Sequence, residues 1–120
     1  MTVFELISGD RHSILDTRLT AKLEQSCYVV NQGHQNDRSQ EISQLERADT
    51  MVADLFKLDF RIGYDLCLAE QLDLPNLVLV NANLRLPEII KDSPKLKLVY
   101  YQTTNQALLE LDSNLKKLRN

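Results

Sequence analysis

The sequence has few of the residues that cross-link small proteins or hold metal ions. It contains two cysteines, Cys27 and Cys67, which are too far apart for a CxxC pair or a zinc-ligand spacing. Each lies in an apolar stretch, so we expect buried free thiols and no disulfide framework. The two histidines, His12 and His34, have neither a cysteine nor an HxxxH spacing beside them. The pattern therefore gives no support for a metal site, and we expect no cofactor.

An excess of basic residues and a long apolar run are also lacking. The 14 Lys and Arg residues are outnumbered by 17 Asp and Glu residues, which gives a formal net charge of −3. This balance matches a phosphate backbone poorly, so we expect no nucleic-acid polymer as a partner. No segment approaches the roughly 18 uninterrupted apolar residues of a membrane span, and the first segment, "MTVFELISGDRHS", has no basic leader. We therefore expect a cytoplasmic protein that does not bind membranes.

What the chain does contain is a regular alternation of short apolar runs and helix-period segments. Its length and its apolar content of 43% suit a single domain, 1–120. Strand-like runs lie at 2–8, 27–30, 50–55, 77–81 and 95–101. Helical patterns lie at 12–25, 40–48, 65–72, 86–92 and 104–118, the last with Thr103 or Thr104 as its N-cap. This order predicts an α/β fold, a flavodoxin-like doubly wound sheet of five parallel strands in the order 2-1-3-4-5.

Ligands of such a sheet bind beyond the carboxyl ends of the strands, at the point where the strand order reverses. Here that point lies between the first and third strands, beside the loops 8–13 ("SGDRHS") and 56–64 ("FKLDFRIGY"). The first loop leads into a helix N-terminus, which binds anions readily. It matches neither a phosphate loop nor GxGxxG, so an ordinary turn is the alternative interpretation.

Three acidic residues are candidates for chemistry near this point, and each has an ordinary structural alternative. Asp65 follows the second loop, where an acid in the first turn of a helix would stabilise the helix dipole. Glu41 lies in a helical segment that leads toward the third strand, and it could equally belong to a solvated helix face. Asp54 ends the third strand and could bind a sugar hydroxyl or cap a turn.

The stretch 45–80, "LERADTMVADLFKLDFRIGYDLCLAEQLDLPNLVLV", resembles the nucleoside 2-deoxyribosyltransferase-like superfamily, which includes the deoxynucleoside 5′-monophosphate N-glycosidases. The shared pattern is an "AD" pair, an apolar strand ending in an acid, a loop, a "GY" pair followed by an acid, and a proline before another apolar strand. In this chain the pattern falls on Ala48-Asp49, Asp54, Gly63-Tyr64, Asp65 and Pro75. The family fold is the same doubly wound sheet.

The resemblance implies an enzyme that cleaves or transfers the N-glycosidic bond of a small nucleoside or nucleoside 5′-monophosphate, as an N-glycosidase or a deoxyribosyltransferase. Asp65 occupies the position of the family nucleophile, a carboxylate that stabilises or captures the oxocarbenium-like centre left by the departing base. Glu41 occupies the position of a second acid that assists the leaving base or positions the nucleophile. The family usually has Glu at the first position and Asp at the second, so the two acids have exchanged lengths here.

The resemblance also implies a substrate-binding set and a homodimer that completes the site. Ser8, Gly9 and Arg11 are the closest counterparts of the family's first-loop signature and would line the sugar or phosphate side. Gly63 and Tyr64 would lie beside the nucleophile, where Tyr64 could hold it, pack beside the sugar or be an ordinary core or interface tyrosine. Asp54 would complete the set from the end of the third strand.

Two other interpretations stay open. The exchanged acids and the reduced first loop favour a catalytically inactive family member, which would act as a nucleotide sensor or a protein-interaction module. A phosphoacceptor receiver domain would share the strand order, but the chain lacks paired acids after the first strand.

Overall fold

The computed structural model describes residues 1–7, 14–26, 29–32 and 38–119 of the chain. Strands and helices alternate along it as β1 (Thr2–Ile7), α1 (Ile14–Gln25), β2 (Val29–Gln32), α2 (Arg38–Arg47), β3 (Thr50–Leu55), α3 (Phe60–Gln71), β4 (Asn76–Asn81), α4 (Glu88–Lys91), β5 (Leu98–Tyr101) and α5 (Thr104–Arg119). The strands pair in parallel, in the order β2-β1-β3-β4-β5. The predicted α/β fold with a parallel sheet is confirmed.

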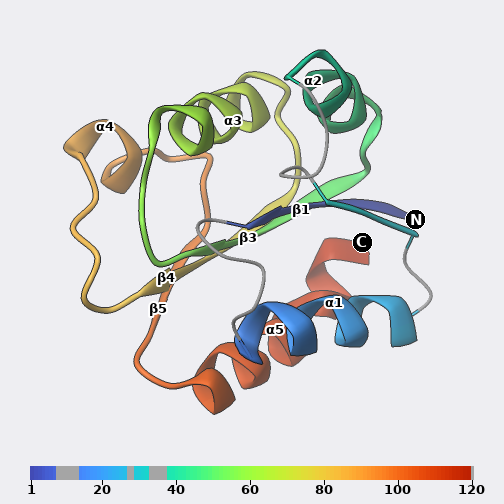
Figure 1. Ribbon diagram of the computed structural model, residues 1–120, viewed down its shortest axis with the longest axis vertical. Coiled ribbons are helices and arrows are strands. Elements are labelled where there is room, and N and C mark those ends of the chain that lie inside the picture. Colours follow the sequence, from blue (N-terminus) through green and yellow to red (C-terminus); the bar gives the residue numbers. More distant parts are fainter. Residues whose placement is uncertain (8–13, 27–28, 33–37, 120) are drawn as a thin grey trace.

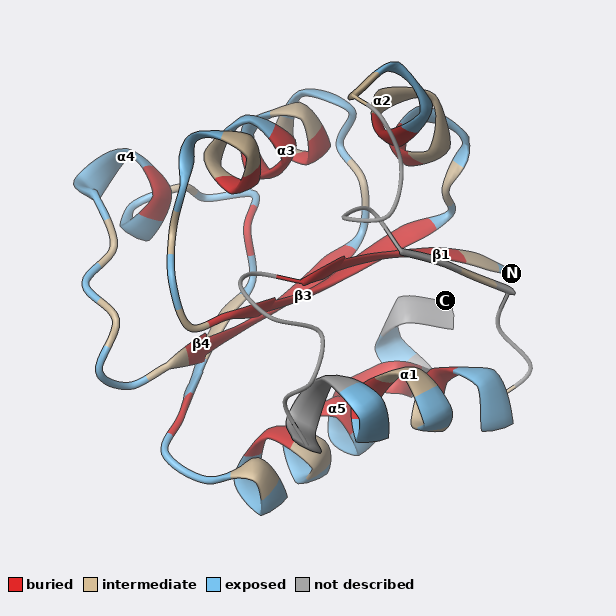
Figure 2. Cartoon of the chain, in the orientation of Figure 1, coloured by how far each residue is buried: buried red, intermediate tan, exposed pale blue. Residues whose placement is uncertain are grey.

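The sheet separates two helical layers. Figure 1 shows α1 and α5 on one face and α2, α3 and α4 on the other. Because successive side chains of a strand point to opposite faces, Val52 packs in the layer of α1 and α5, whereas Met51 and Ala53 pack in the layer of α2, α3 and α4. All six residues of β3 are buried, as is typical of a central parallel strand. The buried residues consequently follow the sheet and the inner sides of the helices (Figure 2).

Helix α3 begins earlier than the sequence pattern predicts. Asp59 is its N-cap, and the Asp59 side chain accepts a hydrogen bond of 2.9 Å from the backbone N–H of Ile62. The segment expected to be a loop up to residue 64 is therefore largely helical, and Asp65 lies well inside the helix. The expectation that Asp65 stabilises the start of a helix is wrong, because Asp59 has that role.

Other boundaries of helices and strands differ from the predicted ones by a few residues. α2 begins at Arg38 and β2 extends to Gln32, so both reach into the segment between the strand expected at 27–30 and the helix expected at 40–48. Thr103 is confirmed as the N-cap of α5: its Oγ1 accepts from the N–H of Gln106, and the Gln106 side chain accepts from the N–H of Thr103.

Cys67 is exposed on α3, which corrects the expectation of a buried thiol. It is two positions beyond Asp65 and therefore points away from the face of α3 that packs on the sheet. Cys27 lies outside the described residues. Within the described part of the chain, no helix is both long enough and apolar enough to cross a membrane.

Candidate functional site

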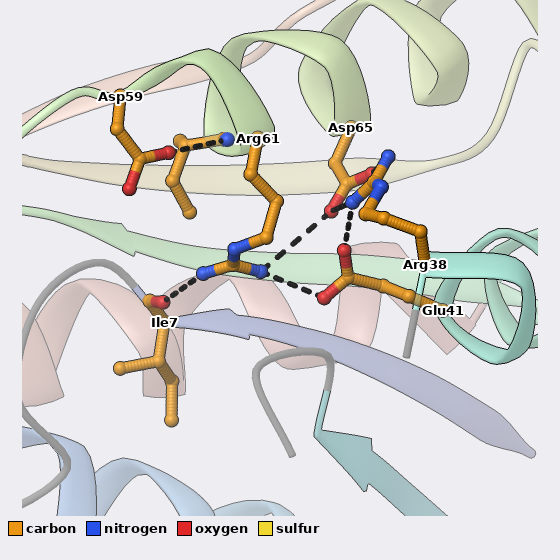
Figure 3. Close-up of polar contacts among 7 residues, drawn as sticks. Ile7, Arg38, Glu41, Asp59, Arg61 and Asp65 are labelled. Carbon is orange, nitrogen blue, oxygen red and sulfur yellow. Dashed lines mark hydrogen bonds and ion pairs between the residues drawn. The ribbon is translucent and has the colours of Figure 1, made fainter. Parts of the chain in front are cut away.

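Two buried carboxylates, Glu41 of α2 and Asp65 of α3, meet on one face of the sheet (Figure 3). Their side chains are 1% and 0% exposed. Each occupies the core-facing side of its helix, because Leu45 follows Glu41 by one turn and Leu66 follows Asp65 directly, and both leucines are buried. Acids at positions that normally hold apolar side chains need charged or hydrogen-bonding partners.

Arg38 supplies one such partner. Its guanidinium donates to Asp65 Oδ1 at 3.0 Å and to Asp65 Oδ2 at 3.4 Å, which is a two-pronged contact. The same side chain also forms an ion pair with Glu41, three residues further along α2. Arg38 is 40% exposed, so its removal from the carboxylates would require no rearrangement of the apolar core.

Arg61 supplies the other partner and ties three segments together. Its Nη1 lies 2.7 Å from Glu41 Oε1 and 3.9 Å from Asp65 Oδ2. Its Nη2 donates to the backbone carbonyl of Ile7, at the carboxyl end of β1, at 3.3 Å. Since Arg61 is on α3 and Glu41 is on α2, this contact holds both helices against the end of the strand beside which a ligand is expected.

Burial makes Glu41 a weaker acid than an ordinary glutamic acid. Removal of its side chain from water raises the pKa of Glu41 to about 7, and the hydrogen-bonding carboxylate of Asp65 adds to the rise through its negative charge. Arg61 and Arg38 oppose the change in pKa. A carboxyl group with a pKa near 7 holds a proton in about half of the molecules at neutral pH, which suits a general acid or base.

Tyr64 lies next to this cluster. The Arg38 guanidinium carbon is 5.0 Å from the centre of the Tyr64 ring, a cation–π contact, and Tyr64 is 47% exposed. Gly63 lies inside α3, where an added Cβ would meet no atom within 4 Å. Gly63 and Tyr64 directly precede Asp65 in α3, and the space beside Gly63 is open.

Asp54, by contrast, is not brought to the cluster. It points to the opposite face of the sheet, where the Tyr101 hydroxyl donates to its Oδ1 at 2.6 Å, and it is fully buried. Its neighbour Val52 packs on the same face, in the layer of α1 and α5. A shared site with Glu41 and Asp65 is thus not supported for Asp54. The predicted residues Ser8, Gly9 and Arg11 lie outside the described residues.

Arg38 and Arg61 were not among the site residues predicted from the sequence. Their spacing contained the signal, because Arg38 precedes Glu41 by three residues and Arg61 precedes Asp65 by four, so each pair shares one side of a helix. This spacing could not be recognised from the sequence, because both arginines were assigned to loops and not to helices. Among the described residues, no group of three His, Cys, Asp or Glu side chains could hold a metal ion.

Comparison with known proteins gives a match in structure and none in sequence. No protein-family model matches the sequence, and neither does any curated protein. Among solved structures, the chain is similar to a CMP N-glycosidase of Clostridium botulinum, with a TM-score of 0.75, 13% identity and coverage of 93% of this chain and 99% of that one. A 2-deoxyribosyltransferase of Bacillus psychrosaccharolyticus gives a TM-score of 0.59, 12% identity and coverage of 87% and 89%.

The fold also occurs as part of a different enzyme. A lysine decarboxylase of Francisella novicida gives a TM-score of 0.58 at 14% identity, with 99% of this chain and 18% of that one covered. At such low identities the likenesses establish a common fold. The doubly wound fold that the resemblance implies is thereby confirmed.

Proposed function

We propose that this chain is a member of the nucleoside 2-deoxyribosyltransferase-like superfamily and that it cleaves or transfers the N-glycosidic bond of a small nucleoside or nucleoside 5′-monophosphate. The observation that carries the proposal is the meeting of two buried carboxylates from separate helices, one of them with a pKa of about 7. The lysine decarboxylase has the same fold, so the fold alone does not carry it. A CMP N-glycosidase and a 2-deoxyribosyltransferase among the similar structures add support.

In the proposed mechanism, Asp65 is the nucleophile and Glu41 the general acid. As the bond between the anomeric carbon and the base breaks, its electron pair moves to the base, which takes the proton of Glu41. A carboxylate oxygen of Asp65 stabilises the developing positive charge and bonds to the anomeric carbon. Water then attacks that carbon, Glu41 takes a proton from the water, and the ester to Asp65 breaks. Attack by a second base in place of water would give transfer.

The two arginines set a condition for this chemistry. Asp65 can reach a sugar only after Arg38 leaves its oxygens, and a phosphate on the substrate would attract the displaced guanidinium. Arg38 and Arg61 therefore favour a nucleoside 5′-monophosphate over an uncharged nucleoside. A homodimer, with Tyr64 beside the sugar, and a cytoplasmic location remain predictions.

The test is direct. The purified protein is incubated with a panel of nucleosides and 5′-monophosphates, and free base is measured by chromatography. We expect base release by the native chain and none by Asp65→Asn. Glu110→Gln serves as a matched control, because it replaces an exposed acid with its amide on α5, on the other face of the sheet. No release from any substrate would exclude the enzymatic proposal.

The second candidate function is nucleotide sensing without catalysis. It is favoured by the two-pronged grip of Arg38 on Asp65, which occupies both oxygens of the proposed nucleophile. A ligand that binds only the folded state raises the melting temperature. A rise with 5′-monophosphates, together with no release of base, would identify a sensor. No rise and no release would leave the protein-interaction module as the remaining alternative.

A further inference from the structure

A cavity lies on the same face of the sheet as the carboxylate cluster, on the far side of α3. It has a volume of about 620 Å³ and is lined by Leu84, Arg85, Leu86, Glu88, Lys91 and Tyr100. These residues come from the segment between β4 and α4, from α4 itself and from the edge strand β5. The volume falls within the range of about 300–1,000 Å³ that is usual for small-molecule sites.

An aromatic ring lies uncovered in this cavity because β5 is the last strand of the sheet. Tyr100 pairs in register with Val80, near the carboxyl ends of β5 and β4, and it is 49% exposed. Leu84 and Leu86 are half-buried beside the α4 layer and supply apolar walls. An exposed ring with apolar neighbours is a surface on which a planar ring can stack.

The charged side chains of the cavity are not engaged elsewhere in the described part of the chain. Arg85, Lys91 and Glu88 have no hydrogen bond or ion pair of their side chains among the described residues. Arg38 and Arg61, in contrast, already hold carboxylates. An anion that arrives at Arg85 and Lys91 therefore displaces only water, whereas one that arrives at Arg38 must compete with Asp65.

From this combination we propose that the cavity is a second ligand site, for a planar nitrogen heterocycle that carries a phosphate. Tyr100 stacks on the heterocycle, Arg85 and Lys91 hold the phosphate, and Glu88 accepts a hydrogen bond from an N–H of the ring. The two cations outweigh the single carboxylate, so an anionic ligand is favoured over a neutral one. The proposal needs no chemistry at Asp65 and stands independently of the proposed function.

The test uses a ligand that the first site cannot consume. Pseudouridine 5′-monophosphate has a carbon–carbon bond to its base, and it is titrated into the isotope-labelled full chain while backbone amide resonances are followed by NMR. We expect saturable shifts in the segments 84–91 and 98–101. Uncharged pseudouridine and inorganic phosphate, which each lack one half of the ligand, should both bind at least about tenfold more weakly.

Variants separate the site from general charge effects. The double variant Arg85→Gln/Lys91→Gln should weaken binding of pseudouridine 5′-monophosphate at least about tenfold. The double variant Arg18→Gln/Lys117→Gln makes the same change in net charge on α1 and α5 and should leave the affinity unchanged. Tyr100→Leu should also weaken binding, because it keeps an apolar side chain but removes the ring.

Three results would overturn the proposal. They are the absence of shifts in the two segments at millimolar ligand, an equal loss of affinity in both double variants, and binding of inorganic phosphate as tight as that of the nucleotide. Shifts confined to residues around Asp65 would also count against this site, although they would agree with the proposed function. Failure of one proposal is thus distinguishable from failure of the other.

Discussion

The two faces of the sheet hold buried acids in different ways. Glu41 and Asp65, on the face of α2 and α3, are paired with arginines that are 40% and 27% exposed. Glu5 and Asp54, on the face of α1 and α5, accept hydrogen bonds from the neutral hydroxyls of Thr20 and Tyr101. All four acids are almost fully buried, so burial does not distinguish them.

The partners do distinguish them. The arginines reach the acids from partly exposed positions on helices and can move to another anion. The Tyr101 hydroxyl belongs to a side chain that is only 5% exposed and is packed in the core with Leu79. We infer that the acids of the first face are available for chemistry and that the acids of the second face stabilise the fold.

The largest expected effect is on activity. Asp65→Asn should lower the rate of base release at least about a thousandfold, because it removes the proposed nucleophile. Glu5→Gln makes the equivalent change on the other face and should leave the rate per folded molecule unchanged, as measured by chromatography of the released base. Equal losses in two folded variants would contradict the distinction between the faces.

The next effect is on the pH dependence of stability. The pKa of Glu41 is raised to about 7 in the folded state, so its stabilising contribution is complete below the unfolded pKa of about 4.3 and is lost as pH rises through 7. Relative to Glu41→Gln, the native free energy of unfolding should fall by at most about 4 kcal/mol over this window. Urea denaturation of both proteins from pH 4 to 8 measures this difference. Parallel curves would show that Glu41 does not titrate abnormally.

A smaller effect is expected from the hydroxyl of Tyr101. Tyr101→Phe removes the donor to Asp54 and leaves the ring in place, which should lower the free energy of unfolding by about 1–3 kcal/mol. Tyr100→Phe is the matched control, since Tyr100 is half exposed and lies next to it in β5. Urea denaturation at neutral pH compares them, and a loss equal to that of the control would argue against a structural role for the Asp54 contact.

The smallest effect on stability is expected from Arg38. Arg38→Gln should lower the free energy of unfolding by about 1 kcal/mol, because the glutamine amide can still donate to the buried Asp65 and Arg61 stays 3.9 Å from it. The same variant should reduce the preference for 5′-monophosphates over nucleosides, measured as the ratio of their kcat/KM values. A large loss of stability would show that the contact is structural, as on the other face.

Much of this arrangement could be predicted from the sequence. The run of apolar residues at 50–55 identifies β3 because a strand buried on both faces needs no alternation. The start of α3 was missed because Arg61 and Gly63 interrupt its apolar pattern, although Ile62, Leu66 and Ala69 keep helical spacing.

The partners of the acids depend on contacts that a linear pattern does not contain. The strand alternation places Asp54 on the face of Val52, but which helices cover that face follows only from the three-dimensional path of the chain. Arg38 lies in a polar segment without a helical pattern of apolar residues, so its place at the start of α2 could not be predicted. The meeting of Glu41 and Asp65 came from the resemblance, and their arginine partners came from the structure.

The contact of Arg61 with the Ile7 carbonyl joins residues 54 positions apart, and its contact with Glu41 of α2 joins residues 20 positions apart. Contacts of such long range carry the loop-closure entropy of the intervening segments, so they are stable only where the sheet and both helices hold them in place. The paired acids therefore come together only in the completed domain. A local opening that releases α2 would separate them and switch off the proposed chemistry while most of the sheet is still folded.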